Sequence, residues 1–302
     1  MRPRYVPAFH ESRLDIGMDD GPGHARHGAA AGSISVQCRW IVLSLASAFL
    51  MAIASIAGVY LPGTYAHETP SWAAQGVGQD IVNLLVVLPA LLVSTYFVAK
   101  GSVRGLLVWL GLLVYIVYSY VLYAFFVHFN RLFLVYTAVL GLAFWTLVGS
   151  MVGLRPDRLA AAFDRERTYR AQVVYLMASS LLFAVLWLSD IVPALVSGTT
   201  PRDVAEVGLP VNPIHVLDLA FALPAMLVTA LSLRKRRLFG LLLAVPLMTF
   251  AAVMGTAIVG MSIVMQFRRL AADTDVVVGV CIGLTAIAIG LAYEFLRRVG
   301  GR

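Results

Sequence analysis

The chain has 302 residues, of which 60% are hydrophobic and only 13% are charged, and its mean hydropathy is +0.84. Ordinary soluble domains are about 45–50% apolar and about 25% charged, so this composition excludes disorder, a collagen-like fibre, a disulfide scaffold and an ordinary soluble enzyme. The net charge of +7 comes from short basic segments between apolar stretches, which indicates membrane topology rather than nucleic-acid binding. We therefore predict a polytopic integral membrane protein in contact with the lipid bilayer, with no nucleic-acid partner.

The chain divides into a tail and two membrane parts. Residues 1–38 hold Gly, His, Asp and Arg with little apolar content, so we predict a disordered tail that cannot bury a core. Residues 39–153 and 171–302 are predicted to be the two membrane parts. Residues 154–170 form the basic segment between them.

Eight stretches are long and apolar enough for a helix of about 20 residues that crosses a bilayer. The predicted fold is therefore all-α, with eight transmembrane helices. The predicted spans are residues 40–61, 79–99, 105–127, 132–153, 172–195, 214–233, 238–265 and 276–296.

The distribution of Lys and Arg predicts the orientation. Of the 23 such residues, 19 lie in the tail, the two short turns, the 154–170 segment and the C-terminus, which all fall on one side; four fall on the other side. Basic residues are retained on the cytoplasmic side, so we predict that both termini are cytoplasmic. The excess of Arg over Lys is typical of a high-GC bacterium, which favours the cytoplasmic membrane as the location.

The 154–170 segment has an amphipathic pattern. Leu159 and Phe163 are four residues apart, and we expect them to share one face of a short surface helix and to point toward lipid. A solvated linker that only fixes topology is the alternative.

The sequence resembles itself after a shift of 135 residues. Between positions 83 and 107, 10 of 25 residues are identical to those 135 positions later, including a Pro, a Lys and a Gly. The shift spans four helices, so both halves would have the same orientation. We predict two parallel four-helix repeats related by an axis along the membrane normal.

Each predicted repeat has a proline inside its second span. Pro89 and Pro224 each remove a backbone donor and crowd the carbonyl four residues earlier. Helices interrupted at matching places indicate a binding site in transporters. The alternative is that neighbouring helices satisfy the released groups, as is common in membranes.

Polar side chains at membrane depth match across the two predicted repeats. Ionisable groups there are costly and indicate function. The predicted site for a substrate or an ion, near the outer surface, consists of Ser55, Asp80 and Asn83 from the first half and Asp190, His215 and Asp218 from the second.

This set is compatible with several kinds of chemistry. Neighbouring carboxylates could carry a proton, hold a cation through oxygen, bind a transition metal together with His215, or serve as acid and base in an enzyme. Helix capping is the alternative for Asp80, His215 and Asp218. Asp190 is expected near a helix C-terminus, where the dipole disfavours an anion, so we expect that capping does not explain it.

Two further features bear on binding and assembly. Tyr115 and Tyr118 lie on one face of the third span, and we predict that they line a central cavity; packing or an interfacial aromatic belt is the alternative. Glycine pairs four residues apart at 149/153 and 279/283 indicate close helix packing within the chain or across a homodimer.

No motif indicates a cofactor. The six histidines form no pair at mid-membrane, and GxxxxGK[ST], HExxH and GxSxG are absent, which counts against haem, an ATP-driven pump, a zincin and a serine hydrolase. The leading hypothesis is a secondary transporter or ion-coupled carrier. An outward-facing enzyme or metal protein and a non-catalytic scaffold or sensor are the other hypotheses.

Overall fold

The computed structural model describes residues 36–164, 166–270 and 275–300, which belong to one unit, Gly32–Arg302. The described residues are helical without strands, and eight of their helices are long and apolar enough to cross a membrane. These helices indicate a multi-pass integral membrane protein and confirm the predicted all-α class. All but the last three residues of the predicted tail lie outside the described part.

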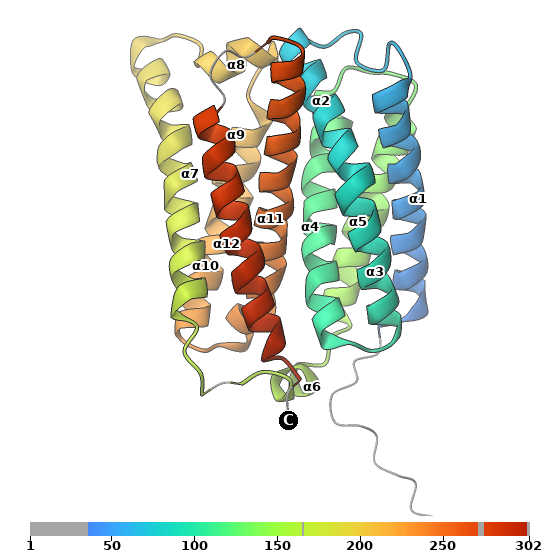
Figure 1. The fold of residues 1–302 in the computed structure, drawn as a ribbon, viewed down its shortest axis with the longest axis vertical. Coiled ribbons are helices and arrows are strands. Elements are labelled where there is room, and N and C mark those ends of the chain that lie inside the picture. The colour runs from blue at the N-terminus through green and yellow to red at the C-terminus, as the bar shows by residue number, and fades with distance from the viewer. Residues whose placement is uncertain (1–35, 165, 271–274, 301–302) are drawn as a thin grey trace, which may run out of the picture. The chain divides into compact units, whose positions relative to one another are not determined.

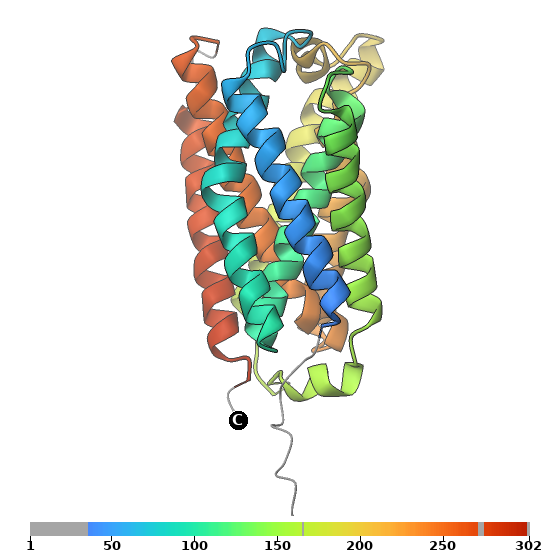
Figure 2. The same ribbon diagram turned by 90° about the vertical axis from the view of Figure 1, so that its right-hand side faces the viewer.

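The spanning helices run up and down in succession (Figures 1 and 2). They are α1 (Cys38–Tyr60), α2–η1–α3 (Pro70–Val82, Asn83–Val87, Leu88–Ala99), α4 (Val103–Phe126), α5 (Phe133–Val152), α7 (Arg170–Ser197), α9–η2–α10 (Pro213–Leu217, Asp218–Ala222, Leu223–Arg234), α11 (Leu238–Phe267) and α12 (Asp275–Arg297); two short helices are α6 (Pro156–Ala161) and α8 (Arg202–Val207).

The second span begins at Pro70 rather than at residue 79 as predicted. The Thr69 hydroxyl accepts a hydrogen bond from the Trp72 backbone N–H, and Pro70 occupies the first helical turn, where its missing N–H costs nothing. Hydropathy alone missed this start because Ser71 and Gln75 interrupt the apolar pattern.

Helices α4 and α11 are the most buried spans, and α12 is the most exposed. Helix α11 packs against α2, α4, α10 and α12, while α1 and α4 pack against α5. Large apolar side chains cover the outer faces of the other helices, for example Phe49, Leu134 and Val185. In a membrane these faces contact lipid, so their exposure requires no further protein partner.

Glycines bring α11 close to its neighbours. A Cβ built on Gly78 of α2 would lie 2.5 Å from the Met261 Cα, and one on Gly111 of α4 would lie 2.5 Å from the Pro246 carbonyl oxygen. Both neighbours are backbone atoms, so neither crossing can accept a side chain without separating the helices. Gly149 packs against Trp40, whereas a Cβ built on Gly279 or Gly283 would meet no atom of the described residues within 4 Å; the homodimer stays a prediction.

Local backbone features recur at a spacing of 135 residues. The π-helical turns η1 and η2 directly precede Leu88-Pro89 and Leu223-Pro224, and in each the leucine N–H donates to the carbonyl five residues back. Both helices then end in the same tight turn, with a positive φ at Gly101 and at Arg236. These matches are what two related four-helix units would produce.

The 154–170 segment packs on protein rather than lipid, so the expectation for its apolar face was wrong. Leu159 and Phe163 are buried. Phe163 contacts Phe295 at the end of α12 with ring centroids 6.2 Å apart, and the Ala162 carbonyl accepts a hydrogen bond from the Gly300 N–H. The segment lies with the C-terminal residues and the 234–237 turn at one end of the unit (Figure 1).

Replacing Gly78 with Ala is expected to destabilise the fold. The added methyl overlaps backbone atoms of α11, and overpacking of this kind costs about 1–3 kcal/mol. Thermal unfolding of detergent-purified protein should show a lower Tm for Gly78→Ala than for wild type. Gly279→Ala is the matched control, because its Cβ would meet no described atom within 4 Å; equal Tm values for the two variants would contradict the close crossing.

Candidate functional site

A cavity of about 340 Å³ lies among α4, α7, α9–α10 and α11, with α8 in its wall. Ligand sites of proteins usually measure about 300–1,000 Å³ and are mainly apolar with a few polar groups. The polar and aromatic side chains in this wall include Gln75, Gln79, Tyr118, Tyr175, Ser179, Phe183, Trp187, Asp203, Glu206, Asn212, Asp218 and Phe250.

Asp218 contributes a carboxylate to the cavity from within the sixth span. It is the first residue of the π turn η2. One oxygen accepts a hydrogen bond from the Tyr118 hydroxyl at 2.9 Å, and the other accepts one from Trp187 Nε1 at 2.8 Å. No ion pair involves Asp218 among the described residues. The carboxylate is therefore oriented by two uncharged donors.

His215 lies one turn before Asp218 and belongs to a separate polar cluster. Its ring contacts Trp187 in a tilted arrangement with centroids 4.8 Å apart. Its Nε2 lies 3.5 Å from an Asp203 carboxylate oxygen but makes no hydrogen bond with any described residue. One ligand atom each from Asp190, Asp203 and His215 lies within 4.8 Å of the others. Burial, followed by the nearby Asp190 carboxylate, raises the pKa of Asp203.

Asp190 has a structural role that the sequence argument excluded. Its two carboxylate oxygens accept hydrogen bonds from the backbone N–H groups of Arg202 and Asp203, at 3.3 and 3.5 Å. Those groups begin helix α8, so Asp190 caps a different helix from the one that carries it. The expectation that capping cannot explain Asp190 was therefore wrong, because it considered only α7.

The first half places Asp80 in a closed polar cluster. Asp80 is 1% exposed, and its carboxylate accepts hydrogen bonds from the Tyr65 hydroxyl at 2.5 Å and the Tyr123 hydroxyl at 2.9 Å. Burial and the Asp80 carboxylate raise the pKa of Tyr65 well above its ordinary value, so Tyr65 keeps the proton that it donates.

Gly58 makes room for this carboxylate. A Cβ at Gly58 would lie 1.8 Å from an Asp80 oxygen and 2.8 Å from the Tyr65 oxygen. Helix α1 therefore contributes a bare backbone surface to the cluster, and the space around Asp80 is fully used.

Asn83 and Ser55 are in contact deep in the first half. Asn83 Nδ2 donates to the Ser55 hydroxyl at 3.4 Å, and the Tyr115 hydroxyl donates to Asn83 Oδ1 at 3.1 Å. All three side chains are buried. Asn83 is the first residue of η1, and Asp218 is the first residue of η2. Tyr115 and Tyr118, three residues apart on α4, therefore each bind the first residue of one π turn.

Only one of the two predicted cavity tyrosines lines the cavity. Tyr118 is in the wall, whereas Tyr115 is fully buried against Asn83 and is not part of it. The two residues share a helix face, but α4 lies between two polar clusters. The three-residue offset between the two tyrosines is therefore enough to bring each hydroxyl to a different cluster.

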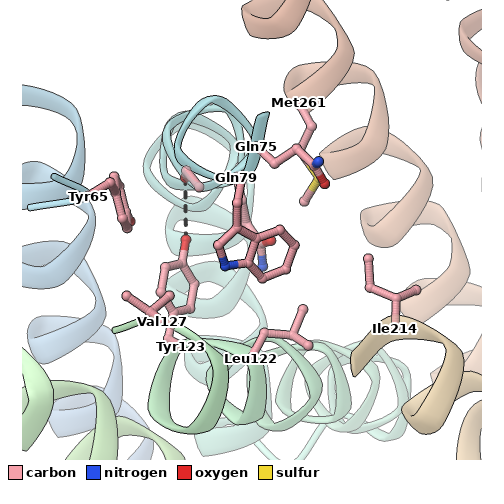
Figure 3. A pocket seen from close by; sticks show the side chains of 10 residues that line it. Tyr65, Gln75, Gln79, Leu122, Tyr123, Val127, Ile214 and Met261 are labelled. Carbon is pink, nitrogen blue, oxygen red and sulfur yellow. Dashed lines mark hydrogen bonds between the residues drawn. The ribbon is translucent and has the colours of Figure 1, made fainter. Parts of the chain in front are cut away.

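A small pocket of about 30 Å³ lies between the closed cluster and the cavity. Figure 3 shows Tyr65 and Tyr123 on one side of it and Ile214 and Met261 on the other. Gln79 belongs to the walls of both hollows. Its side-chain nitrogen is buried and makes no hydrogen bond within the described part of the chain.

Sequence reasoning missed several members of the site. Trp187 is three residues before Asp190 on α7 and so shares its helix face, a signal that was available. Tyr123 follows Tyr115 by two turns of α4, which also places them on one face. Tyr65, Asp203 and Glu206 lie in or next to short connections, and nothing in their local sequence predicts where those connections fold.

No family model, curated protein or solved structure matches the chain. The functional conclusion therefore depends on the geometry of the cavity and of the two polar clusters.

Replacing Tyr123 with Phe is expected to lower the free energy of unfolding by about 1–3 kcal/mol, since a buried carboxylate then loses one of its donors. The Tm in detergent should fall, while Tyr60→Phe should leave it unchanged because Tyr60 is exposed. If Tyr123→Phe has the same Tm as wild type, the hydrogen bond to Asp80 contributes nothing to the stability of the fold.

Proposed function

We propose that the protein is a secondary carrier whose substrate occupies the cavity beside Asp218 and whose coupling ion or proton is held by that residue. The observation that carries the proposal is a carboxylate in a membrane span that faces a ligand-sized, mainly apolar cavity and has only uncharged partners. Such groups are costly in a bilayer and mark substrate or proton pathways.

The backbone at Asp218 supports this function. In transporters, helices that depart from regular geometry frequently form the substrate site, and π turns occur at functional positions. Asp218 and Asn83 begin the two π turns, and a proline follows each turn. The recurrence at 135 residues supports two parallel four-helix repeats, with the binding space opened in the second.

The hydrogen bonds define how Asp218 can take up a proton. The Trp187 indole can only donate, so the oxygen it binds must remain an acceptor. The Tyr118 hydroxyl can donate or accept. A proton therefore enters on the oxygen that faces Tyr118, and the Tyr118 hydroxyl turns to accept it. The carboxyl can change charge without losing either partner.

The basic turns and the C-terminus favour a cytoplasmic location for one end of the unit, as the distribution of Lys and Arg predicts. Helix α8 then lies at the outer surface, and its residues Asp203 and Glu206 belong to the cavity wall. We assign the carrier to a bacterial cytoplasmic membrane, with a polar site near the outer leaflet.

Asp218→Asn is expected to abolish coupled uptake while preserving the fold, because the amide keeps the shape but cannot change charge. Proteoliposomes with an internal pH dye are given an inward proton gradient and a panel of amines, amino acids, carboxylates, sugars and metal ions. Wild type should accumulate at least one compound with proton entry, and Asp218→Asn should lose at least 90% of that uptake.

Glu294→Gln is the matched control, because Glu294 is a membrane-span carboxylate that pairs with Arg298 and Gln172 away from the cavity. Uptake that persists in Asp218→Asn, or that Glu294→Gln reduces equally, argues against the carrier mechanism.

The cluster of Asp190, Asp203 and His215 favours a second function, binding of a divalent metal at the end of the cavity formed by α8. Two carboxylates and an imidazole suit Zn²⁺ or a related ion, and the buried His215 Nε2 atom has no hydrogen-bond partner among the described residues. His128 lies outside this cluster and pairs with Glu68.

A site at this cluster should make Zn²⁺ raise the Tm of wild type by several degrees, since a ligand bound only by the native state stabilises it. His215→Gln should remove that response, and His128→Gln should retain it. Identical Zn²⁺ responses in all three proteins, or no response in wild type, would eliminate this second function.

A further inference from the structure

The charged groups of the cavity wall are all acidic. Asp218 lies on the sixth span, and Asp203 and Glu206 lie on α8; no Lys or Arg of the described chain belongs to the wall. Carboxylates in a space of low polarity attract a cation far more strongly than they would in water. An anionic ligand would meet three like charges in the wall, where no described basic side chain compensates them.

The apolar part of the wall suits an organic cation better than a bare ion. Aromatic rings from three helices face the cavity: Tyr118 from α4, Phe183 and Trp187 from α7, and Phe250 from α11. Tyr118 and Phe250 contact each other at 5.3 Å between centroids, and Phe183 and Trp187 at 6.1 Å. Aromatic faces attract ammonium groups and also bury hydrocarbon.

Two buried polar groups in the wall lack partners. Ser179 is 3% exposed and Gln79 is 5% exposed, and neither the Ser179 hydroxyl nor the Gln79 side-chain nitrogen makes a hydrogen bond within the described residues. Buried polar groups are seldom left unpaired in a native protein. Both groups line the cavity, so polar atoms of a ligand can satisfy their hydrogen bonds. The Ser179 hydroxyl can accept from an ammonium N–H, and the Gln79 nitrogen can donate to a ligand oxygen.

We propose that the ligand of this cavity is an organic cation, an amine with an apolar body of about the size of one aromatic ring. Its ammonium group lies beside Asp218, and its apolar body lies against Trp187 and Phe250. This inference rests on the proposed carrier function, since it names the substrate class for the same site.

The test uses compounds of one shape and different charge. Phenethylammonium, phenethyltrimethylammonium, 2-phenylethanol and phenylacetate are titrated against full-length protein in detergent by calorimetry, and each is then tested for counterflow in proteoliposomes. Both cations should bind wild type at least tenfold more tightly than 2-phenylethanol, and phenylacetate should not bind. Asp218→Asn should weaken the cations at least tenfold while leaving 2-phenylethanol unchanged.

A second variant tests the aromatic contact without touching the carboxylate. Phe250→Leu should weaken both cations several-fold more than it weakens 2-phenylethanol, because it removes a ring face and keeps an apolar side chain. Trp145→Phe is the control, since Trp145 is exposed on the outside of α5. Full cation affinity in Asp218→Asn, or equal losses for cation and alcohol in Phe250→Leu, overturns the assignment.

The outcomes separate the ligand class from the carrier function. Tight, Asp218-dependent binding of the cations without counterflow supports the organic cation and contradicts the carrier. Counterflow of 2-phenylethanol or phenylacetate, but of neither cation, supports the carrier and overturns the organic cation. Failure of both cations to bind wild type also overturns it.

Discussion

A polar group inside a bilayer has no water to bind, so the protein must supply its partners. This constraint explains most of the side-chain arrangement in the chain. Asp80 receives two tyrosine hydroxyls and a space prepared by Gly58. Asp218 also receives two donors, but it remains partly exposed to a cavity. The same solution therefore gives a closed structural cluster in one half and an accessible group in the other.

Helix α4 supplies a hydrogen-bond donor to each of these two carboxylates. It is the most buried span, and three of its tyrosines supply hydroxyls to different polar residues. Tyr123 reaches Asp80, Tyr115 reaches Asn83, and Tyr118 reaches Asp218. A movement of α4 relative to either π turn would change all these hydrogen bonds together. These hydrogen bonds therefore link the surroundings of Asp218 to those of Asp80 and Asn83 through one helix.

The eight spans could be predicted from the sequence because lipid imposes long apolar runs, and the polar candidates could be predicted because few polar residues interrupt those runs. Their partners could not be predicted in the same way. Asp190 caps α8 because a connection folds back over α7, and hydropathy carries no information about that path. Leu159 was expected to face lipid, but the C-terminal residues cover its segment, a contact between positions far apart in the chain. Tyr118 lines the cavity and Tyr115 does not because of the rotation of α4 about its axis. A periodic sequence pattern predicts that rotation only to within a residue or two.

The two halves carry different residues at several positions spaced 135 residues apart. Tyr65 and Tyr123, which close the space around Asp80, correspond in spacing to Thr200 and Ile258, and Ile258 lies in the cavity wall. Ser44 accepts a hydrogen bond from Trp109, whereas Ser179, 135 positions later, makes no hydrogen bond with a described residue, and the position that matches Trp109 is Ala244. At these positions the first half has aromatic donors, whereas the matching positions of the second half have small or aliphatic residues. This difference leaves room for the cavity beside Asp218 and leaves the Ser179 hydroxyl without a hydrogen bond among the described residues.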